Sequence, residues 1–396
     1  MTTLEAMWAD IEPIGREGGG GYRRFAWTPE DAVLREWFAA ACQARGLDLT
    51  TDRAGNQWAW WGDPDAAAAA GRPGVVTGSH LDSVPSGGAF DGPLGVMSAL
   101  AAVDSLRSKG FQPARPIGVV NFGDEEGARF GVACAGSRVI TGALSPDRAR
   151  ALADADGTTL AEASAAAGQD PSHLGRDPET LSRIGTFVEL HVEQGRGLVD
   201  LDRPVAVGSS IWPHGRWRLD LAGEANHAGT TRLVDRKDPT LDLAQVISAA
   251  RTQAQQRGCV ATVGKVRVEP NGVNAIPSRV QAWLDARGPV EADVRAVAEA
   301  VAAAGKTPAV EESFTPDTTF DRALVARLSA LLGDAPILST GAGHDAGILA
   351  AAGVTSAMLF VRNPTGVSHS PAEFAEWDDC LAGVEALTRV LEDLAR

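Results

Sequence analysis

Three histidines follow short apolar, β-branched runs and stand beside carboxylates: His80, His191 and His369. Asp82 and Asp91 come after the first of them, and the pair Glu125-Glu126 comes after another apolar run. Imidazole and carboxylate groups without thiolates are suitable ligands for Zn²⁺ and also for Mn²⁺, Co²⁺ or Ni²⁺. The pattern predicts a metal centre, and the ligand types leave the choice of metal open.

The neighbouring carboxylates Glu125 and Glu126 offer two different functions. A carboxylate shared by two ions about 3.5–4 Å apart creates a centre that activates water and polarises a carbonyl together. Hydrolysis at such a centre also requires a general base that does not bind metal. One glutamate can serve as a ligand while the other acts as the base. A single histidine is more often a hydrogen-bonded core or surface residue than a ligand, so the prediction depends on the joint pattern.

The elements that must position these residues have the pattern of an α/β domain. A strand is expected at 74–80, a helix at 93–109 and a second strand at 117–122. Strand, helix and strand in this order predict a βαβ unit and therefore a parallel sheet. The apolar runs 186–190 and 356–361 predict further strands of the same sheet. Ligand sites of open α/β sheets lie outside the carboxyl ends of the strands, which is where the polar residues gather.

Between about 207 and 320 the pattern changes. Apolar and polar residues alternate in 216–221 and in 280–287, which is typical of antiparallel strands with one solvated face. Helical stretches near 238–256 and 290–304 would cover the other face. The segment predicts a smaller α+β domain of βαββα-like order, inserted into the larger α/β domain.

Composition excludes several classes of protein. Over 396 residues, Lys+Arg 36 against Asp+Glu 51 leaves a net charge of −15, which disfavours nucleic acid or an anionic membrane as partner. The four cysteines lie too far apart for a thiolate zinc site or a disulfide framework: Cys42, Cys134, Cys259 and Cys380. The first residues lack a secretory signal pattern, and no apolar run approaches a membrane span. We expect a cytoplasmic protein.

Seven ordered segments carry a resemblance to a known family: 77–84, 87–96, 124–130, 189–195, 224–231, 341–346 and 368–371. They resemble the M20 metallopeptidase-like amidohydrolases, in particular the branch of N-carbamoyl-L-amino-acid hydrolases, allantoate amidohydrolases and β-ureidopropionases. The resemblance extends from about residue 20 to the carboxyl terminus. It implies a large dinuclear-metal α/β catalytic domain, 1–207 and 321–396, with an inserted α+β lid and dimerisation domain, 208–320.

The resemblance also implies a ligand set for two divalent ions per subunit, with Zn²⁺ expected first and Mn²⁺, Co²⁺ or Ni²⁺ as alternatives. His80, Asp91 and His191 would hold one ion. Asp91 would bridge to the second ion, together with Glu126 and His369.

Three catalytic roles are implied in the same way. Glu125 would take a proton from water and deliver it to the leaving nitrogen, and Asp82 would orient the His80 ring. The alternative for Asp82 is a solvated carboxylate in a turn. His227 would reach the site of the neighbouring subunit and stabilise the oxyanion, which requires a homodimer. Without the matching segment, His227 would be a cap or loop histidine in a Gly/Thr-rich turn.

Substrate contacts follow from matching positions as well. Asn274 and Arg287 would bind a substrate carboxylate, and Gln194 would lie near the ureido group. A guanidinium can hold a carboxylate with two parallel hydrogen bonds. The alternative for Arg287 is a surface ion pair with Asp285. Arg216 lies in a matching segment as a further substrate-binding candidate, without a specific role.

The expected reaction is hydrolysis of a linear ureido C–N bond, in an N-carbamoyl-L-amino acid or allantoate, with release of ammonia and carbon dioxide. Segments 211–216 and 361–367 depart from the commoner family loops, so the substrate is less determined than the metal chemistry. An M20-type aminoacylase or dipeptidase acting on an N-acyl or peptide bond stays open as an alternative.

Two other classes have weaker support. Segment 341–346 matches G-x-G-x-x-A after a plausible strand, 336–339, which would suit a dinucleotide-binding oxidoreductase. It lies too near the carboxyl terminus for a usual mononucleotide-binding half. A non-catalytic binding module is disfavoured because all the ligand types and a candidate base are present. The chain contains neither a P-loop nor a G-x-S-x-G motif.

Overall fold

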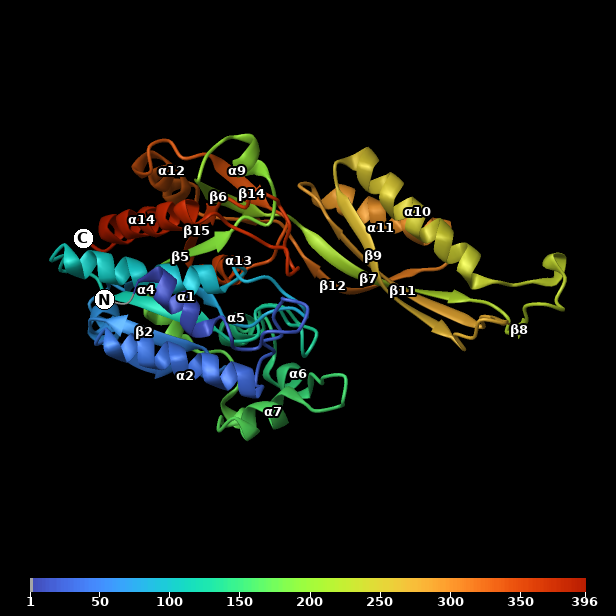
Figure 1. Cartoon of the computed structure of the whole chain (residues 1–396), viewed down its shortest axis with the longest axis horizontal. Helices are drawn as coiled ribbons and strands as arrows, with labels where there is room; N and C mark the ends of the chain where they lie inside the picture. Colours follow the sequence, from blue (N-terminus) through green and yellow to red (C-terminus); the bar gives the residue numbers. More distant parts are fainter. Residues whose placement is uncertain (1–2) are drawn as a thin grey trace. The chain divides into compact units, whose positions relative to one another are not determined.

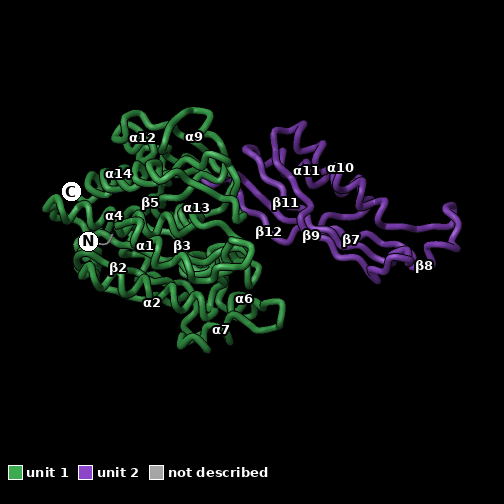
Figure 2. Tube along the Cα trace, viewed as in Figure 1, with its two compact units in different colours: residues 1–210, 319–396 green, residues 211–318 purple. Residues whose placement is uncertain are grey.

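A computed structural model describes residues 3–396 of the chain (Figure 1). The chain divides into two compact units, coloured separately in Figure 2. Unit 1 comprises the residues up to Ser210 together with Thr319–Arg396, and unit 2 is Ile211–Thr318. Sequence analysis placed the inserted segment at 208–320. Within residues 3–396, every helix is too short or too polar to cross a membrane.

Unit 1 is organised around a mixed sheet with nine strands among the described residues. The order is β1-β2-β4-β3-β5-β15-β6-β13, and β14 pairs with β6. The bounds are β1 (Asp48–Thr51), β2 (Gln57–Trp61), β3 (Gly74–His80), β4 (Ile117–Phe122), β5 (Ile184–Val192), β6 (Val205–Ile211), β13 (Thr318–Thr319), β14 (Ile337–Thr340) and β15 (Thr355–Val361).

The centre of this sheet consists of the four strands expected from apolar runs. β4, β3, β5 and β15 are neighbours in that order, and each adjacent pair is parallel. Every residue of β3 and β4 is buried, as expected for strands covered on both faces. The antiparallel strands β1, β2 and β6 were not predicted. Because the central strands are parallel, their carboxyl ends meet at one edge of the sheet.

Helices of unit 1 pack against this sheet and against one another. Their bounds are α1 (Leu4–Ile11), α2 (Pro29–Ala44), α3 (Pro64–Ala69), α4 (Pro93–Ser108), α5 (Ala135–Thr141), α6 (Pro146–Ala151), α7 (Leu160–Ala166), α8 (Pro178–Ser182), α9 (Gly197–Asp200), α12 (Arg322–Leu331), α13 (Asp345–Ala351) and α14 (Trp377–Leu394), with a 3₁₀ turn η1 (Pro171–His173). The predicted helix after β3 is α4, which begins with Pro93 at its first position and packs on β3, β5 and α14. Its start holds the preceding Asp91 next to the strand ends.

Unit 2 is an antiparallel sheet with two helices. The sheet order is β12-β7-β11-β9. The bounds are β7 (His214–Ala222), β8 (Asn226–His227), η2 (Leu233–Asp235), α10 (Pro239–Arg257), β9 (Val260–Glu269), β10 (Ala275–Ile276), β11 (Arg279–Arg287), α11 (Glu291–Gly305) and β12 (Ala309–Thr315). β8 and β10 form a separate two-stranded pair.

The alternation predicted for unit 2 produces its hydrophobic core. Leu219 of β7 and Leu284 of β11 are fully buried in one cluster with Val246 of α10 and Val297 of α11. The long elements follow the order βαββαβ, so the predicted order lacked the last strand, β12. This strand carries two adjacent glutamates and is mostly exposed at the edge of the sheet, so its sequence lacks the apolar alternation of a half-buried strand.

Candidate metal centre

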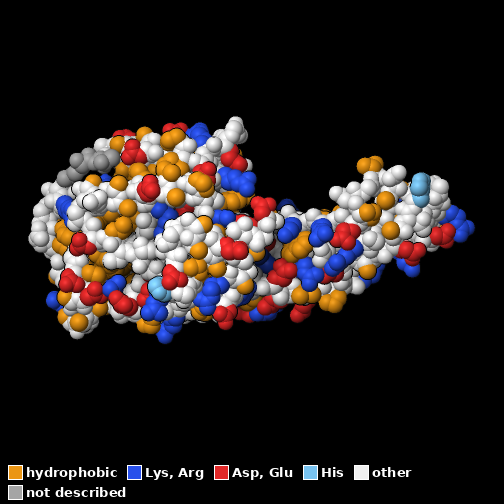
Figure 3. All heavy atoms as spheres, turned by 90° about the horizontal axis from the view of Figure 1, so that it is seen from below, with side chains coloured by type: hydrophobic (Ala, Val, Ile, Leu, Met, Phe, Trp, Pro, Cys, Tyr) orange, Lys and Arg blue, Asp and Glu red, His pale blue; other side chains and the backbone are white. Residues whose placement is uncertain are grey.

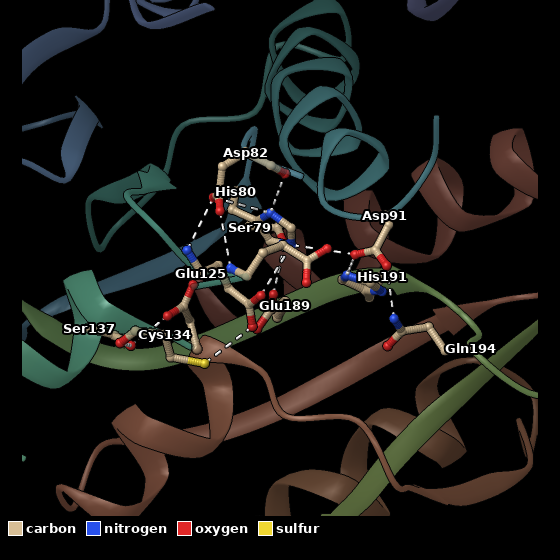
Figure 4. Close-up of polar contacts among 12 residues, drawn as sticks. Ser79, His80, Asp82, Asp91, Glu125, Cys134, Ser137, Glu189, His191 and Gln194 are labelled. Atoms are coloured by element: carbon tan, nitrogen blue, oxygen red, sulfur yellow. Dashed lines mark hydrogen bonds and ion pairs between the residues drawn. The ribbon is translucent and has the colours of Figure 1, made fainter. Parts of the chain in front are cut away.

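The predicted ligands of unit 1 lie at the carboxyl ends of the four central strands or in the loops that follow them. His80 ends β3, His191 is the penultimate residue of β5, and Glu125-Glu126 follows β4. His369 lies in the loop after β15. Figure 4 shows His80, Asp91 and His191 facing one another beside Glu125. The parallel topology therefore brings together side chains that lie far apart in sequence.

The first group consists of His80, Asp91 and His191, all buried. Asp91 Oδ1 lies 3.6 Å from His80 Nε2 and 3.2 Å from His191 Nε2. Among the described side chains, none forms a hydrogen bond with either of these buried Nε2 atoms. A buried polar atom left without a partner is costly, so each of these nitrogens is explained by a ligand that completes the site.

The other ring nitrogens set the tautomer of both histidines. His80 Nδ1 lies 3.1 Å from the carbonyl oxygen of Asp82, and His191 Nδ1 lies 2.9 Å from that of Val192. A carbonyl only accepts, so Nδ1 carries the proton and Nε2 presents its lone pair to the centre. Gly92 makes room for the His80 ring, because a Cβ at this position would lie 2.5 Å from it.

The second group consists of Asp91, Glu126 and His369. His369 Nε2 lies 3.4 Å from Asp91 Oδ2 and 3.5 Å from Glu126 Oε2. Asp91 therefore presents one oxygen to each group. His369 has a left-handed backbone (φ 54°) and a side chain that is 51% exposed, so this group is open to solvent on one side.

The spacing of these atoms fits divalent cations. Bonds of about 2.0–2.2 Å to N and O ligands in a tetrahedral site separate neighbouring ligand atoms by about 3.3–3.6 Å. The four contacts to Asp91 and Glu126 measure between 3.2 and 3.6 Å. The donor set and the free Nε2 atoms therefore fit two ions that share Asp91, and nitrogen and oxygen donors leave the metal's identity open.

The electrostatics of the cluster favour bound positive charge. Burial raises the pKa of Glu126 to about 7, and the neighbouring Asp91 adds to this effect. The contact with Asp91 raises the pKa of His369 to about 9. Burial also raises the pKa of Glu125 well above its usual range. Crowded carboxylates attract cations, and protons and metal ions compete for them.

Asp82 and Cys134 hold the Glu125-Glu126 segment. Asp82 accepts the backbone N–H groups of Glu125 and Glu126, both at 3.1 Å. Its exposed fraction is 4%, so the alternative of a solvated turn carboxylate is wrong. The Cys134 thiol donates to Glu125 Oε1 at 3.2 Å, while Glu125 Oε2 lies 3.7 Å from His80 Nε2. Glu125 thus faces the centre without belonging to either ligand group.

Gln194 lies at the shared carboxylate. Its Nε2 donates to Asp91 Oδ2 at 2.8 Å and to the Ser368 hydroxyl at 3.1 Å. Its Oε1 is buried without a hydrogen-bond partner among the described residues. The predicted contact residue is therefore part of the cluster in unit 1, with one acceptor still available.

The other four predicted residues, Arg216, His227, Asn274 and Arg287, lie in unit 2. His227 Nδ1 accepts the N–H of Gly229 at 3.0 Å, and the next residue, Ala228, donates its N–H to the carbonyl of Asn274 at 2.9 Å. Arg216 and Arg287 both contact Asp285, at 3.2 Å and 2.7 Å. The ion pair considered for Arg287 is thus present. In Figure 3, acidic and basic side chains are interspersed over the visible face.

Comparison with known proteins gives the family. The model of peptidase family M20/M25/M40 matches residues 76–393. The chain belongs to this family. The matched residues include the candidate ligands from His80 to His369, and the predicted resemblance to this family is confirmed.

Relatives along the whole chain carry amidohydrolase names. An N-carbamoyl-L-amino acid amidohydrolase of Geobacillus stearothermophilus is 37% identical, covering 100% of both chains. An allantoate amidohydrolase of Escherichia coli (strain K12) is 31% identical over 97% of this chain and 96% of that protein. The crystal structure of an amidase of the hydantoinase/carbamoylase family from Burkholderia vietnamiensis has a TM-score of 0.88 at 30% identity, covering 99% and 96%. The mixed α/β fold is that of M20 amidohydrolases, which leaves the oxidoreductase alternative without support.

Several polar residues of this M20 site were missed or left without a role. The hydroxyl of Ser79 donates to Glu189 at 2.7 Å (Figure 4). The hydroxyl of Ser137 donates to Asp345 at 2.5 Å. Asp345 lies in the matching segment 341–346, which marked it without a function. Cys134 has no signal in the sequence, because its contact with Glu125 depends on a left-handed turn before α5 (φ 54°).

Proposed function

We propose that the chain is a metal-dependent amidohydrolase that cleaves a linear ureido C–N bond, in an N-carbamoyl-L-amino acid or allantoate, releasing ammonia and carbon dioxide. The observation that carries the proposal is Asp91, whose two oxygens face separate groups of ligand atoms. The names of the full-length relatives support the substrate class.

In this proposal, His80, Asp91 and His191 hold one ion, and Asp91, Glu126 and His369 hold the other. When bound, divalent cations polarise a carbonyl and lower the pKa of water. The free Nε2 atoms and the contact distances support this assignment. Gln194, which contacts Asp91 and keeps one acceptor free, binds the ureido group.

Glu125 is the general base in the proposed reaction. Its carboxylate is buried and faces the centre, and the Cys134 thiol holds Oε1 so that Oε2 points toward His80 Nε2. Burial raises its pKa, which makes it a better proton acceptor than an exposed glutamate. It takes the proton of the attacking water and returns it to the leaving nitrogen. Asp82 positions Glu125 through the backbone and orients the His80 ring.

Unit 2 supplies the remaining groups as a lid and dimerisation domain. His227 Nδ1 accepts a backbone N–H, so the neutral ring carries its proton on Nε2 and presents a donor. We infer that this donor stabilises the oxyanion in the site of a partner subunit. Arg287 and Asn274 bind the substrate carboxylate, with Arg216 beside Arg287 on Asp285. These roles rest on matching family positions, and the role of His227 requires a homodimer.

A substrate screen tests the proposal. Protein stripped of metal by a chelator is reloaded with Zn²⁺, Mn²⁺, Co²⁺ or Ni²⁺ and assayed with allantoate, N-carbamoyl-L-amino acids, N-acyl-L-amino acids and dipeptides. We expect stripping to abolish turnover, reloading to restore it, and ammonia to appear only with the ureido compounds. Turnover of N-acyl amino acids or dipeptides alone would instead support the aminoacylase or dipeptidase alternative. Full turnover in stripped protein would contradict the metal-dependent reaction.

A further inference from the structure

A buried glutamate outside both ligand groups connects the segments that carry them. Glu373 is 5% exposed and lies four residues after His369. Its Oε1 accepts the backbone N–H groups of Phe90 and Asp91, at 2.8 and 2.9 Å. Its Oε2 accepts the hydroxyl of Ser368 at 3.0 Å. One carboxylate therefore ties the backbone of the shared ligand to the loop that carries the last histidine.

The hydrogen bonds around Glu373 also extend to the Asp91 side chain. The Ser368 hydroxyl lies 3.2 Å from Asp91 Oδ2, the oxygen that faces His369. Gln194 Nε2 donates to both Asp91 Oδ2 and the Ser368 hydroxyl. The rotation of the Asp91 carboxylate is thus restrained from the Glu373 side as well as from the histidine side.

The glycine-rich loop before Asp91 is shaped to admit this carboxylate. A Cβ at Gly88 would lie 2.2 Å from Glu373 Oε1 and 2.5 Å from Glu373 Cβ. These distances are far below van der Waals contact, so any larger residue at position 88 must displace Glu373. Gly88 and Glu373 are 285 residues apart in sequence, and neither contributes a ligand atom to the two groups.

We propose that Glu373 is a positioning residue that holds Asp91 as the bridge between the two ligand groups. Without it, the backbone N–H groups of Phe90 and Asp91 lose their acceptor, and the Asp91 carboxylate can turn away from the second group. The ion between Asp91, Glu126 and His369 depends most on the hydrogen bonds of Glu373, because the His369 side chain is 51% exposed. The inference rests on the proposed dinuclear function and adds a residue to it.

Asp177 provides a matched control within unit 1. It is also 5% exposed, and its carboxylate also accepts two backbone N–H groups and one hydroxyl, from Arg53, Thr180 and the Thr180 side chain. It caps α8 and belongs to neither ligand group. Replacing Asp177 removes as many hydrogen bonds as replacing Glu373 does, but none of them involves Asp91.

The test measures metal binding directly. Chelator-stripped wild type, E373A, E373Q, G88A and D177A are titrated with Co²⁺, following the visible absorption bands and the bound equivalents by metal analysis. We expect E373A and G88A to lower the affinity for one of the two ions by about 10–100-fold, as loss of a supporting hydrogen-bond partner does. The absorption bands of the Co²⁺ bound at that position should also change. E373Q keeps an oxygen for the two amides and should bind both ions with nearly wild-type affinity. D177A should bind both ions normally, even if its unfolding temperature falls.

Three outcomes are distinguishable. Wild-type affinity for both ions in E373A overturns the positioning role while leaving the proposed function intact. An equal loss of the second ion in D177A also overturns it, because the effect would then be general destabilisation. A wild type that binds fewer than two ions overturns the dinuclear function itself and this inference with it. If E373A does not fold, G88A decides: normal second-ion affinity in G88A overturns the proposal.

Discussion

The two units hold their predicted functional residues in opposite ways. In unit 1 the candidate ligands are buried at strand ends, and the Nε2 atoms of His80 and His191 have no hydrogen-bond partner among the described residues. In unit 2 the candidate residues are exposed or half-buried, and Arg216 and Arg287 are paired with Asp285. Buried groups with unmet bonding capacity point to a ligand by their geometry alone, whereas satisfied surface groups do not.

The same contrast appears in the acidic residues. Burial raises the pKa of Glu125 well above its usual range. Burial by itself would raise the pKa of Asp285 as well. The neighbouring Arg287 and Arg216 outweigh burial and hold the pKa of this carboxylate below its usual range. At Glu125 the neighbouring positive charge does not offset burial, whereas at Asp285 it does. A substrate carboxylate that binds Arg287 must compete with Asp285 for the guanidinium.

The largest expected effect tests unit 1. Glu125→Gln keeps the size of the side chain and removes the proton acceptor. We expect kcat to fall by about 10²–10⁴-fold, the range for loss of a positioned general base. Bound metal, measured by elemental analysis, should stay at two ions per chain, because Glu125 belongs to neither ligand group.

A suitable control is Glu193→Gln. Glu193 is also buried and lies two residues after His191, but it accepts the backbone N–H groups of Gly197 and Leu198. We expect this variant to keep most of its activity. Wild-type kcat in Glu125→Gln, or an equal loss in both variants, would remove Glu125 from its role.

A smaller loss is expected from His227→Ala in unit 2. Removing one donor to a developing oxyanion costs about 2.7–4 kcal/mol, or about 10²–10³ in kcat. Metal content should not change, since His227 lies outside unit 1. His173→Ala, which removes an exposed histidine of unit 1, should leave kcat unchanged.

Mixing experiments sharpen this second prediction. A hybrid of His227→Ala with Glu125→Gln would contain one site with an intact base and an intact donor if the site is shared between subunits. After random exchange of subunits, activity should recover to roughly a quarter of the wild-type value. No recovery in a verified hybrid would contradict a shared site and confine His227 to its own chain.

The smallest effect is expected from Arg287→Lys. A lysine keeps the charge but loses the two-pronged geometry that matches a carboxylate. Loss of about 1.4 kcal/mol of binding corresponds to about a tenfold rise in KM, with little change in kcat. Arg218→Lys is the matched control, because Arg218 is similarly exposed (27% against 28%) and also pairs with acids on the same sheet. Equal KM values in the two variants would argue against substrate binding by Arg287.

Much of the positioning scaffold could be predicted from sequence. The apolar runs that became β3, β4, β5 and β15 are short, buried and bounded by turn residues, so their type and parallel arrangement followed from local pattern. The strand β12 could not be predicted, because an exposed edge strand with adjacent glutamates has no core-facing alternation. An alternating hydrophobic pattern arises only where one face of a strand is buried, and most residues of β12 are exposed.

The candidate site divides in the same way. His80, His191 and His369 could be selected by residue type at or just beyond strand ends, and the M20 resemblance assigned the ligand set of each ion. Cys134 and Glu373 were missed because their hydrogen bonds depend on the folded backbone: Cys134 meets Glu125 through a left-handed turn, and Glu373 meets the N–H groups of Phe90 and Asp91 from the far end of the chain. Hydrogen bonds of this kind leave no periodicity or spacing that the sequence alone would reveal.

By itself, the sequence determined the family, the parallel core and the types of ligand, because residue chemistry and apolar periodicity are local properties. Only the tertiary structure decided which oxygen of Asp91 faces which histidine, which ring nitrogens are free, and which carboxylate holds the loop around Gly88. These features depend on distances between chain segments that are set when the strands pack, and no local stretch of sequence encodes them.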